Sequence, residues 1–531
     1  MFYTVVRILV IAACCTWAGL SAMHMLQAQR YQIPALRKDL KRYSGMFTGE
    51  ILVAAGAAAL NWYMPILLSM AIQKEQTRET LCNWLMLALF IGATAFVYFQ
   101  KQRIPQRKPF GFTRRIARLV TCAFILNLLG AILLNLMGLS PYIVFAGVDY
   151  AVLAAALIMR PIEDRINAGF YKSAQQKLAQ AKGLIRIGIT GSYGKTETKI
   201  ILKTLLSEKY KVLATPPSFS TAMGISRVVN EQLKKGHQVF IAEMGAQQKG
   251  EIKDLTRLVR PQYGVLTCVG KAHLDSFGSI EAVAQTKFEL IQGLKEGGMA
   301  FFGSDGSYGD RLYGLCKSEK YRAAVGSEVE AYMRAEHMET GVRGTRFELI
   351  CADGEHAWVQ AKLLGCFSVR NIALAAAVAR KLGLTMEEIV RGVEKLRPIR
   401  HHLQLIPGEI NVIDDSENIN ADGAAEALRV LSEFPGRRIL VTAGLQELER
   451  NADDQNFAFG MQIAGCADYV ILIGPEDTRA VMRGLMNSRY PKSSVRMVRD
   501  AYDAAALVKE MAQKGDSVLY EGVYPEDEDE E

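Results

Sequence analysis

The chain has 531 residues, 50% of them hydrophobic and 22% charged, so it is too long for one ordinary domain and more apolar than a typical soluble protein. Its nine cysteines form no C-x-x-C pair and show no zinc-ligand spacing, which argues against a disulfide framework or a metal knuckle. The formal net charge of +8 is explained by basic loops between apolar segments, and no signature of nucleic-acid binding accompanies it.

The apolar excess lies at the N-terminus. Five stretches are near the roughly 20 residues that a helix needs to cross a bilayer, and they occur at about 2–23, 50–72, 81–99, 118–139 and 141–159. Buried helices of a soluble core are the alternative. Five stretches separated by short polar loops favour a transmembrane region of about five helices over residues 1–160. A cleaved signal peptide is disfavoured, because basic residues and further apolar stretches follow the first one.

The loops between these stretches predict an orientation, because Lys and Arg near span ends stay on the cytoplasmic side. Loops 24–49 and 100–117 are strongly basic, with Arg30, Arg37, Lys38, Lys41 and Arg42 in the first and Lys101, Arg103, Arg107, Lys108, Arg114 and Arg115 in the second. The loop near residue 75 is charge-balanced. We therefore expect a multi-pass plasma-membrane protein with its N-terminus outside and everything after residue 160 in the cytoplasm, where ATP is available.

Strands and helices alternate after a polar connecting helix at 161–183. Predicted strands lie at 211–214, 238–242, 263–269 and 299–302, with helices near 222–235, 249–259 and 280–294. This alternation indicates an α/β domain with a mainly parallel sheet over residues 184–398. A smaller Rossmann-like α/β domain is predicted over 399–531, with strands at 410–413, 438–442, 469–473 and 517–520 and an acidic tail at 525–531.

A phosphate-binding loop joins the first predicted strand, at 184–189, to a predicted helix at 197–207. Backbone N–H groups and the start of that helix would face an anion, the lysine would reach the terminal phosphates, and the threonine hydroxyl would hold Mg²⁺. A tight turn is the alternative, but the strand–loop–helix context favours ATP binding. The residues concerned are Gly191, Ser192, Tyr193, Gly194, Lys195 and Thr196.

Two further side chains follow predicted strands, at the edge where ligands bind in open α/β sheets. Glu243 ends one strand and could hold magnesium, and His273 follows the next strand as a candidate metal ligand or phosphate contact. A lone histidine after a strand is more often structural, although the nearby phosphate loop favours a functional role.

Lys287 lies in the helix that begins at Ser279. At helical spacing it falls within the apolar stripe of that helix, formed by Ile280, Ala284, Ile291 and Leu294. A solvated surface lysine is the alternative, but this position predicts a desolvated amine with a lowered pKa. A neutral amine can react with carbon dioxide.

Five ordered motifs carry a resemblance to a known family. They are T-G-S-x-G-K-T (190–196), E-M-G-A (243–246), A-H-L-x-x-F-G-S (272–279), K-x-E (287–289) and D-D-S-x-N-x-N (414–420). The chain from about residue 184 onward resembles the Mur ligase family, within it the branch that adds D-alanyl-D-alanine to the UDP-muramyl tripeptide.

The resemblance implies roles for individual residues. Lys287 matches a lysine that is carbamylated and helps to hold magnesium, and it joins Lys195 and His273 in the catalytic set. Thr196, Glu243 and His273 match metal and phosphate contacts. Asn371 and Asp415 match nucleotide contacts, the latter from the C-terminal domain.

The chain also departs from the family pattern. Glu197 stands where Ser or Thr is usual, Phe367-Ser368 where His-Asn is usual, and Gly303 where an adenine-contacting Asn is frequent. Further departures are Cys268 for Asn, His402 for Arg and Ala421 for Pro. About 25 residues separate the last span from the ATP-binding strand, too few for the UDP-binding domain of the family, since a domain needs at least about 50.

These observations predict a membrane-anchored, ATP- and Mg²⁺-dependent ligase that acts through an acyl phosphate in peptidoglycan or related envelope synthesis. Its partners would be an amino acid or dipeptide as the amine, a carboxylate acceptor that is lipid-linked or held at the membrane surface, and membrane lipids. A non-catalytic nucleotide-binding scaffold for cell-wall enzymes is the rival hypothesis. A transporter ATPase is disfavoured because the other signatures of such ATPases are missing.

Overall fold

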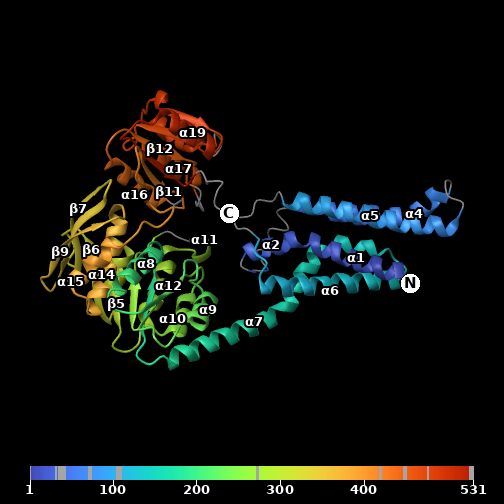
Figure 1. Cartoon of the computed structure of the whole chain (residues 1–531), viewed down its shortest axis with the longest axis horizontal. Coiled ribbons are helices and arrows are strands. Elements are labelled where there is room, and N and C mark those ends of the chain that lie inside the picture. Colours follow the sequence, from blue (N-terminus) through green and yellow to red (C-terminus); the bar gives the residue numbers. More distant parts are fainter. Residues whose placement is uncertain are drawn as a thin grey trace. The chain divides into compact units, whose positions relative to one another are not determined.

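The computed structural model describes residues 2–29, 31, 33, 44–69, 74–102, 110–270, 274–417, 421–445, 451–474 and 478–524. The chain divides into two compact units, Met1–Gly169 and Phe170–Glu531. The first unit is built from helices and the second contains two β-sheets with helices on their faces (Figure 1).

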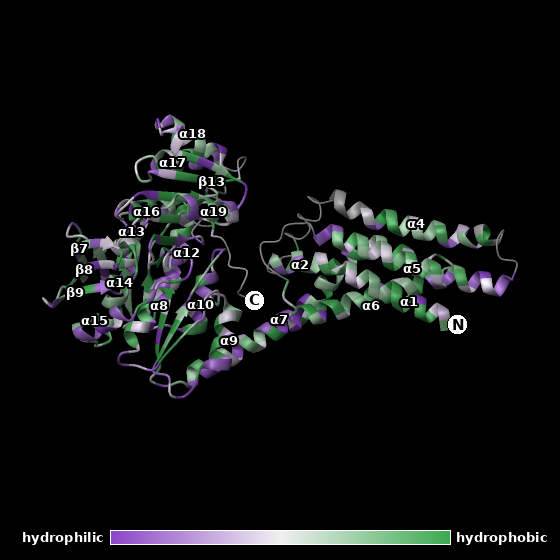
Figure 2. Ribbon diagram, turned by 45° about the horizontal axis from the view of Figure 1, so that its top comes forward, coloured by the Kyte–Doolittle hydropathy of each residue, from purple (hydrophilic) through white to green (hydrophobic). Residues whose placement is uncertain are grey.

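The first unit contains long apolar helices. They are α1 (Phe2–Ala18), α2 (Leu20–Ala28), α4 (Ser44–Ser69), α5 (Glu75–Gln102), α6 (Arg114–Leu136), the 3₁₀ helix η1 (Pro141–Gly147) and the first part of α7 (Val148–Gln180). Hydrophobic residues dominate α1, α5 and α6 (Figure 2). Among the described residues, four segments are long and apolar enough to cross a membrane: Phe2–Ala28, Glu75–Gln102, Arg114–Leu136 and Pro141–Gln180.

The stretch predicted at 50–72 lies on α4, a helix of 26 residues whose one charged side chain is Glu50. The stretch runs past Ser69 into residues outside the described part of the chain. That α4 crosses the membrane as a fifth span stays a prediction.

A buried ion cluster joins three helices of the first unit. Lys101 of α5 contacts Glu50 of α4, and its Nζ lies 3.0 Å from Oδ2 of Asp149 at the start of α7. The prediction that Lys101 belongs to a basic loop is wrong, because α5 continues to Gln102 and buries this lysine. In apolar surroundings a charged group must be paired, and these carboxylates pair it.

Helix α7 replaces two predicted segments. Most of the last apolar stretch, from Val148 onward, and most of the connecting helix form one helix of 33 residues that continues through the boundary expected at residue 160. Pro161 lies inside it. Residue polarity changes near this point because the helix changes surroundings, and the backbone continues without a break.

The larger sheet of the second unit has nine strands. They are β1 (Ile185–Thr190), β2 (Val212–Ala214), β3 (Val239–Glu243), β4 (Tyr263–Leu266), β5 (Met299–Gly303), β6 (Glu319–Val325), β7 (Met333–Gly341), β8 (Gly344–Cys351) and β9 (His356–Ala361). Their order is β2-β3-β1-β4-β5-β6-β7-β8-β9, parallel from β2 to β7 and antiparallel from β7 to β9. The predicted mainly parallel sheet is confirmed, whereas the predictions missed β6 to β9.

Helices cover both faces of this sheet. One face packs against α8 (Lys195–Leu206), α14 (Gly365–Lys381) and α15 (Met386–Glu394). The other packs against α9 (Ala222–Gln232), α10 (Glu251–Val259), α12 (Ile280–Gln292) and α13 (Tyr308–Leu315). Alternate residues of each strand serve the two cores: Ile241 lies in the first and Phe240 in the second. The sheet therefore holds the loops at its carboxyl edge in fixed positions.

The smaller sheet has six strands in the order β10-β11-β15-β12-β13-β14, all parallel except β10. The strands are β10 (Gln404–Ile406), β11 (Asn411–Asp415), β12 (Arg438–Thr442), β13 (Tyr469–Ile473), β14 (Val495–Val498) and β15 (Ser517–Glu521). Helices α16 (Ala421–Ser432), α17 (Ala452–Ile463) and α18 (Arg479–Asn487) pack on one face and α19 (Ala501–Met511) on the other. The Rossmann-like prediction is confirmed, and the acidic tail at 525–531 lies outside the described residues.

Candidate functional site

The predicted phosphate loop lies between β1 and α8, at the carboxyl edge of the larger sheet. Strands β3 and β4 flank β1, so Glu243 and the residues after Leu266 end at the same edge. Helix α8 begins at Lys195, directly after the loop, and its positive end faces this edge. The strand–loop–helix geometry that an anion requires is therefore present.

Close packing against β4 determines the shape of the loop. The Ser192 N–H donates to the carbonyl oxygen of Cys268 over 2.9 Å, and the Thr267 hydroxyl donates to the Tyr193 carbonyl. Gly191 has φ +153°, and a Cβ there would lie 2.0 Å from Oγ1 of Thr267. A residue with a side chain cannot take this position without moving β4.

Lys195 folds back over the loop, with Nζ donating to the Ser192 carbonyl over 2.8 Å. Burial lowers the pKa of Lys195, and the charge of the Glu243 carboxylate opposes that change. The amine thus lies between the loop and Glu243, where a terminal phosphate would place negative charge.

Thr196 and Glu243 contact each other, as expected for two groups that share a metal ion. The Thr196 hydroxyl lies 3.1 Å from each carboxylate oxygen of Glu243. Magnesium is commonly held by one or two carboxylates together with substrate phosphates, so these residues fit such an ion.

Sequence reasoning missed the third member of this group. Lys199 is buried, and its Nζ lies 2.7 Å from Oε2 of Glu243. It follows Thr196 by three residues on α8, so both side chains lie on one face of the helix. That spacing is the signal in the sequence that could have identified Lys199.

Lys287 points into the protein, as its place in the apolar stripe of α12 predicts. Its side chain is buried, and burial, with a smaller effect from the charge of Lys195, lowers its pKa to about 7. Among the described residues, no hydrogen bond or ion pair holds its amine. A substantial fraction of this lysine is therefore neutral near pH 7.

A further predicted residue, Asn371 of α14, lies beside the phosphate loop, where a Cβ on Gly194 would be 2.8 Å from its Oδ1. Asp415 ends β11 in the smaller sheet, where its Oδ1 accepts the Leu403 N–H over 2.8 Å. Its register partner on β15 is Glu521, and burial together with the Asp415 charge raises the pKa of Glu521 well above the usual range. The role of Asp415 in nucleotide binding stays a prediction, and His273 lies outside the described residues.

Comparisons with known proteins agree with this geometry. A family model described as the Mur ligase middle domain matches residues 189–379, and one described as the Mur ligase glutamate ligase domain matches residues 401–523. Together they match more than half of the chain. The chain belongs to the Mur ligase family.

Individual relatives support the same assignment. The UDP-N-acetylmuramoyl-tripeptide–D-alanyl-D-alanine ligase of Treponema pallidum is 30% identical over 302 residues, which cover 56% of this chain and 64% of the relative. The protein of the same name from Bacillus subtilis is 27% identical, with 66% and 76% covered. The match to the Treponema protein thus spans less than two thirds of that relative.

Solved Mur ligase structures share the fold. A crystal structure of MurF from Acinetobacter baumannii matches with a TM-score of 0.60 at 24% identity, covering 67% of this chain and 77% of the other. MurF from Thermotoga maritima in complex with ADP matches with a TM-score of 0.59, also at 24% identity, covering 67% of this chain and 80% of the other.

Two departures from the Mur ligase pattern have a steric or polar explanation. A Cβ at Gly303 would lie 2.4 Å from the Thr267 carbonyl oxygen, so no asparagine side chain fits there. Cys268 is enclosed by the loop, with Sγ 3.6 Å from the Tyr193 carbonyl oxygen, and burial raises the pKa of its thiol. No side chain at residue 303 can therefore contact a nucleotide at this edge.

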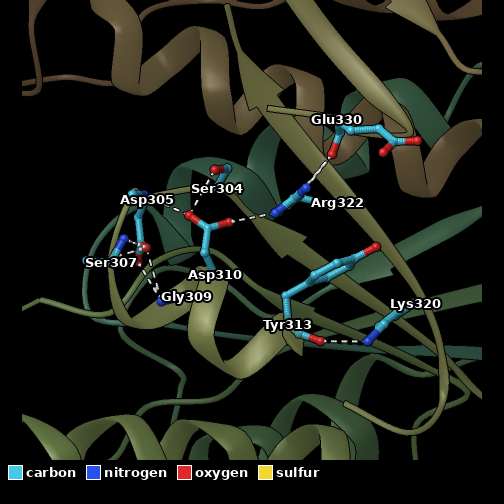
Figure 3. Close-up of polar contacts among 10 residues, drawn as sticks. Ser304, Asp305, Ser307, Gly309, Asp310, Tyr313, Lys320, Arg322 and Glu330 are labelled. Carbon is cyan, nitrogen blue, oxygen red and sulfur yellow. Dashed lines mark hydrogen bonds and ion pairs between the residues drawn. The ribbon is translucent and has the colours of Figure 1, made fainter. Parts of the chain in front are cut away.

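Hydrogen bonds of two aspartates hold the segment after β5 in place (Figure 3). Asp305 accepts the N–H groups of Ser307 and Gly309 over 2.9 and 3.0 Å, and it also accepts the Val269 N–H over 3.0 Å. Asp310 accepts the Ser304 hydroxyl over 3.0 Å. These bonds join the loops after β4 and β5 into one polar edge.

The substitution Lys195→Ala tests the phosphate loop. We expect ATP affinity to fall at least about tenfold, because the variant loses charge-assisted contacts to the phosphates. The fold should be retained, because Lys195 lies in the loop-to-helix junction and is not a member of either hydrophobic core. Titration calorimetry with Mg²⁺-ATP and thermal unfolding of the full chain in detergent measure both effects.

Lys203→Ala is the matched control, because Lys203 is exposed on the same helix. Equal ATP affinities for the Lys195→Ala variant and the unaltered protein would refute the assignment of the loop.

Proposed function

We propose that the protein is a membrane-anchored ligase that uses ATP to join an amine to a carboxylate in the synthesis of peptidoglycan or a related envelope polymer. The observation that carries the proposal is the contact of Thr196 with Glu243 directly beside the phosphate loop. The names of the relatives support an amide-forming reaction of the same class.

The proposed reaction has two steps. An acceptor carboxylate oxygen bonds to the γ-phosphorus of ATP as the bond to the ADP oxygen breaks, which gives an acyl phosphate. The amine nitrogen then bonds to the acyl carbon, phosphate leaves and the nitrogen loses a proton. The loop backbone and Lys195 would neutralise charge on the transferring group. Thr196 and Glu243 would hold Mg²⁺, which supplies further neutralisation when bound.

We further propose a membrane-held acceptor. About 25 residues, most of them in the polar part of α7, separate the last apolar stretch from β1, which begins at Ile185. An acceptor anchored in the same membrane would be presented at a high effective concentration. A soluble UDP-muramyl peptide that binds in the remaining cleft is the alternative.

Amide formation with matched acceptors tests the reaction and the acceptor together. Mass spectrometry of the full chain with Mg²⁺-ATP, amino acids or dipeptides, and soluble or lipid-linked muramyl peptides should show product with the lipid-linked form. Product from the soluble UDP form alone would refute the acceptor proposal. ATP binding without product from any acceptor would favour the non-catalytic scaffold.

Lys287 is proposed to act as a carbamate. Its neutral fraction can bond to carbon dioxide, and the product is an anionic group that could bind magnesium. The buried position and the lowered pKa support this chemistry.

The substitution Lys287→Ala should therefore leave almost no ligase activity, and short carboxylic acids that occupy the place of the carbamate should restore part of it. Lys295→Ala, at an exposed lysine just after the same helix, is the control. Ligase activity of each variant is measured with and without added acetate. A fully active Lys287→Ala variant would show that Lys287 is an ordinary buried lysine and does not act as a carbamate.

The proposed orientation requires α4 to cross the membrane as well. Twenty-six residues make a helix of about 39 Å, enough to span the hydrocarbon core. Five crossings would put the N-terminus and the ATP site on opposite sides, and the basic loops favour the N-terminus outside and the ATP site in the cytoplasm.

Cysteine labelling of a cysteine-depleted chain tests the orientation. Thr77→Cys should react in intact cells, whereas Phe112→Cys should react only after the membrane is opened, because the basic loop containing residue 112 is expected inside. The reverse pattern would place the ATP site outside and overturn the functional proposal.

A further inference from the structure

Glu197 extends from the first turn of α8 to α14. Its Oε1 accepts the Ser368 hydroxyl and its Oε2 accepts the Asn371 amide, each over 2.6 Å. Residues 368 and 371 are one turn apart, so both donors lie on the face of α14 that meets α8. Both donor residues are buried, which makes these charge-assisted hydrogen bonds strong.

Two departures from the Mur ligase pattern are thus partners in space. The resemblance to the family implies Ser or Thr in place of Glu197 and Asn in place of Ser368. The Glu197 side chain on α8 is longer than Ser or Thr, and the Ser368 side chain on α14 is shorter than Asn. The longer acceptor therefore reaches the shorter donor, and the two changes complement each other. Their contact indicates one altered interaction with a function of its own.

The carboxylate also settles how Asn371 is oriented. A carboxylate only accepts, so the NH₂ group of Asn371 must face Glu197. The amide group as a whole lies beside the phosphate loop, where a Cβ on Gly194 would be 2.8 Å from Oδ1 and 2.9 Å from Nδ2. Among the described residues, Oδ1 has no hydrogen-bond partner, which leaves it available as an acceptor.

We propose that Glu197 is a positioning residue that holds Asn371 so that its amide oxygen meets a hydrogen-bond donor of the nucleotide, a ribose hydroxyl or a base amine, and not a phosphate oxygen. The inference rests on the proposed function, because it deepens the nucleotide site of that ligase.

An exchange of donor and acceptor tests the pair. Asn371→Asp sets two carboxylates against each other and should weaken ATP binding about a hundredfold. Adding Glu197→Gln supplies an amide that can accept from Ser368 and donate to the new carboxylate, so binding should return to within about tenfold of the unaltered protein. A merely structural role for Glu197 would not produce recovery, and no recovery overturns the inference.

Single variants complete the test in titrations of the full chain with Mg²⁺-ATP. Glu197→Ala should weaken binding about tenfold, and Ser368→Ala should have no further effect in that background, because Ser368 acts through Glu197. If the two substitutions together weaken ATP binding by the product of their separate effects, the inference is overturned. Glu208→Gln, which removes a carboxylate that pairs with Lys395 beyond the far end of α8, should bind as the unaltered protein does.

The unaltered protein separates this inference from the proposed function. If it fails to bind Mg²⁺-ATP, the proposed function fails. If it binds and Glu197→Ala binds equally well, only the role of Glu197 is overturned.

Discussion

The packing of the phosphate loop against β4 is the constraint on which the site depends. Thr267 and Cys268 hold the backbone of Ser192 and Tyr193, and no space remains for a side chain at Gly191. Because β3 lies on the other side of β1, the same edge brings Glu243 to the first turn of α8. The sheet thus brings the backbone of the loop, the Lys195 amine and the Glu243 carboxylate together at one edge.

Carboxylates tie α14 to its neighbours. Glu197 binds Ser368 and Asn371, and Glu426 of α16 accepts the N–H groups of Cys366 and Phe367 at the start of the same helix. The free N–H groups and dipole at a helix start favour such anions. Helix α14 therefore joins the phosphate-binding helix to α16 of the smaller sheet, so its position is sensitive to both.

The helical first unit, Met1–Gly169, differs from the second in the polarity of its surface. Large apolar side chains lie on its surface, and Phe96 and Phe99 are each 64% exposed. Lys101 is buried in this unit and pairs with Glu50 and Asp149. Helix α7 is continuous, but its first part is rich in apolar residues and its second part in polar ones. The residues of each part match the surroundings of that part, as the apolar and polar faces of a helix do.

The sequence by itself determined the elements with a clear period, the phosphate loop and the inward position of Lys287, because these depend on residues close together in the chain. It did not predict β6 to β9, the end of α5 beyond Lys101, or the continuity of α7. Only the tertiary structure decided that Lys199 pairs with Glu243, that residue 303 has no room for a side chain, and that Glu197 binds Asn371, 174 residues away. Periodicity shows which face of an element is buried, whereas the partner on that face is set by the packing of distant segments.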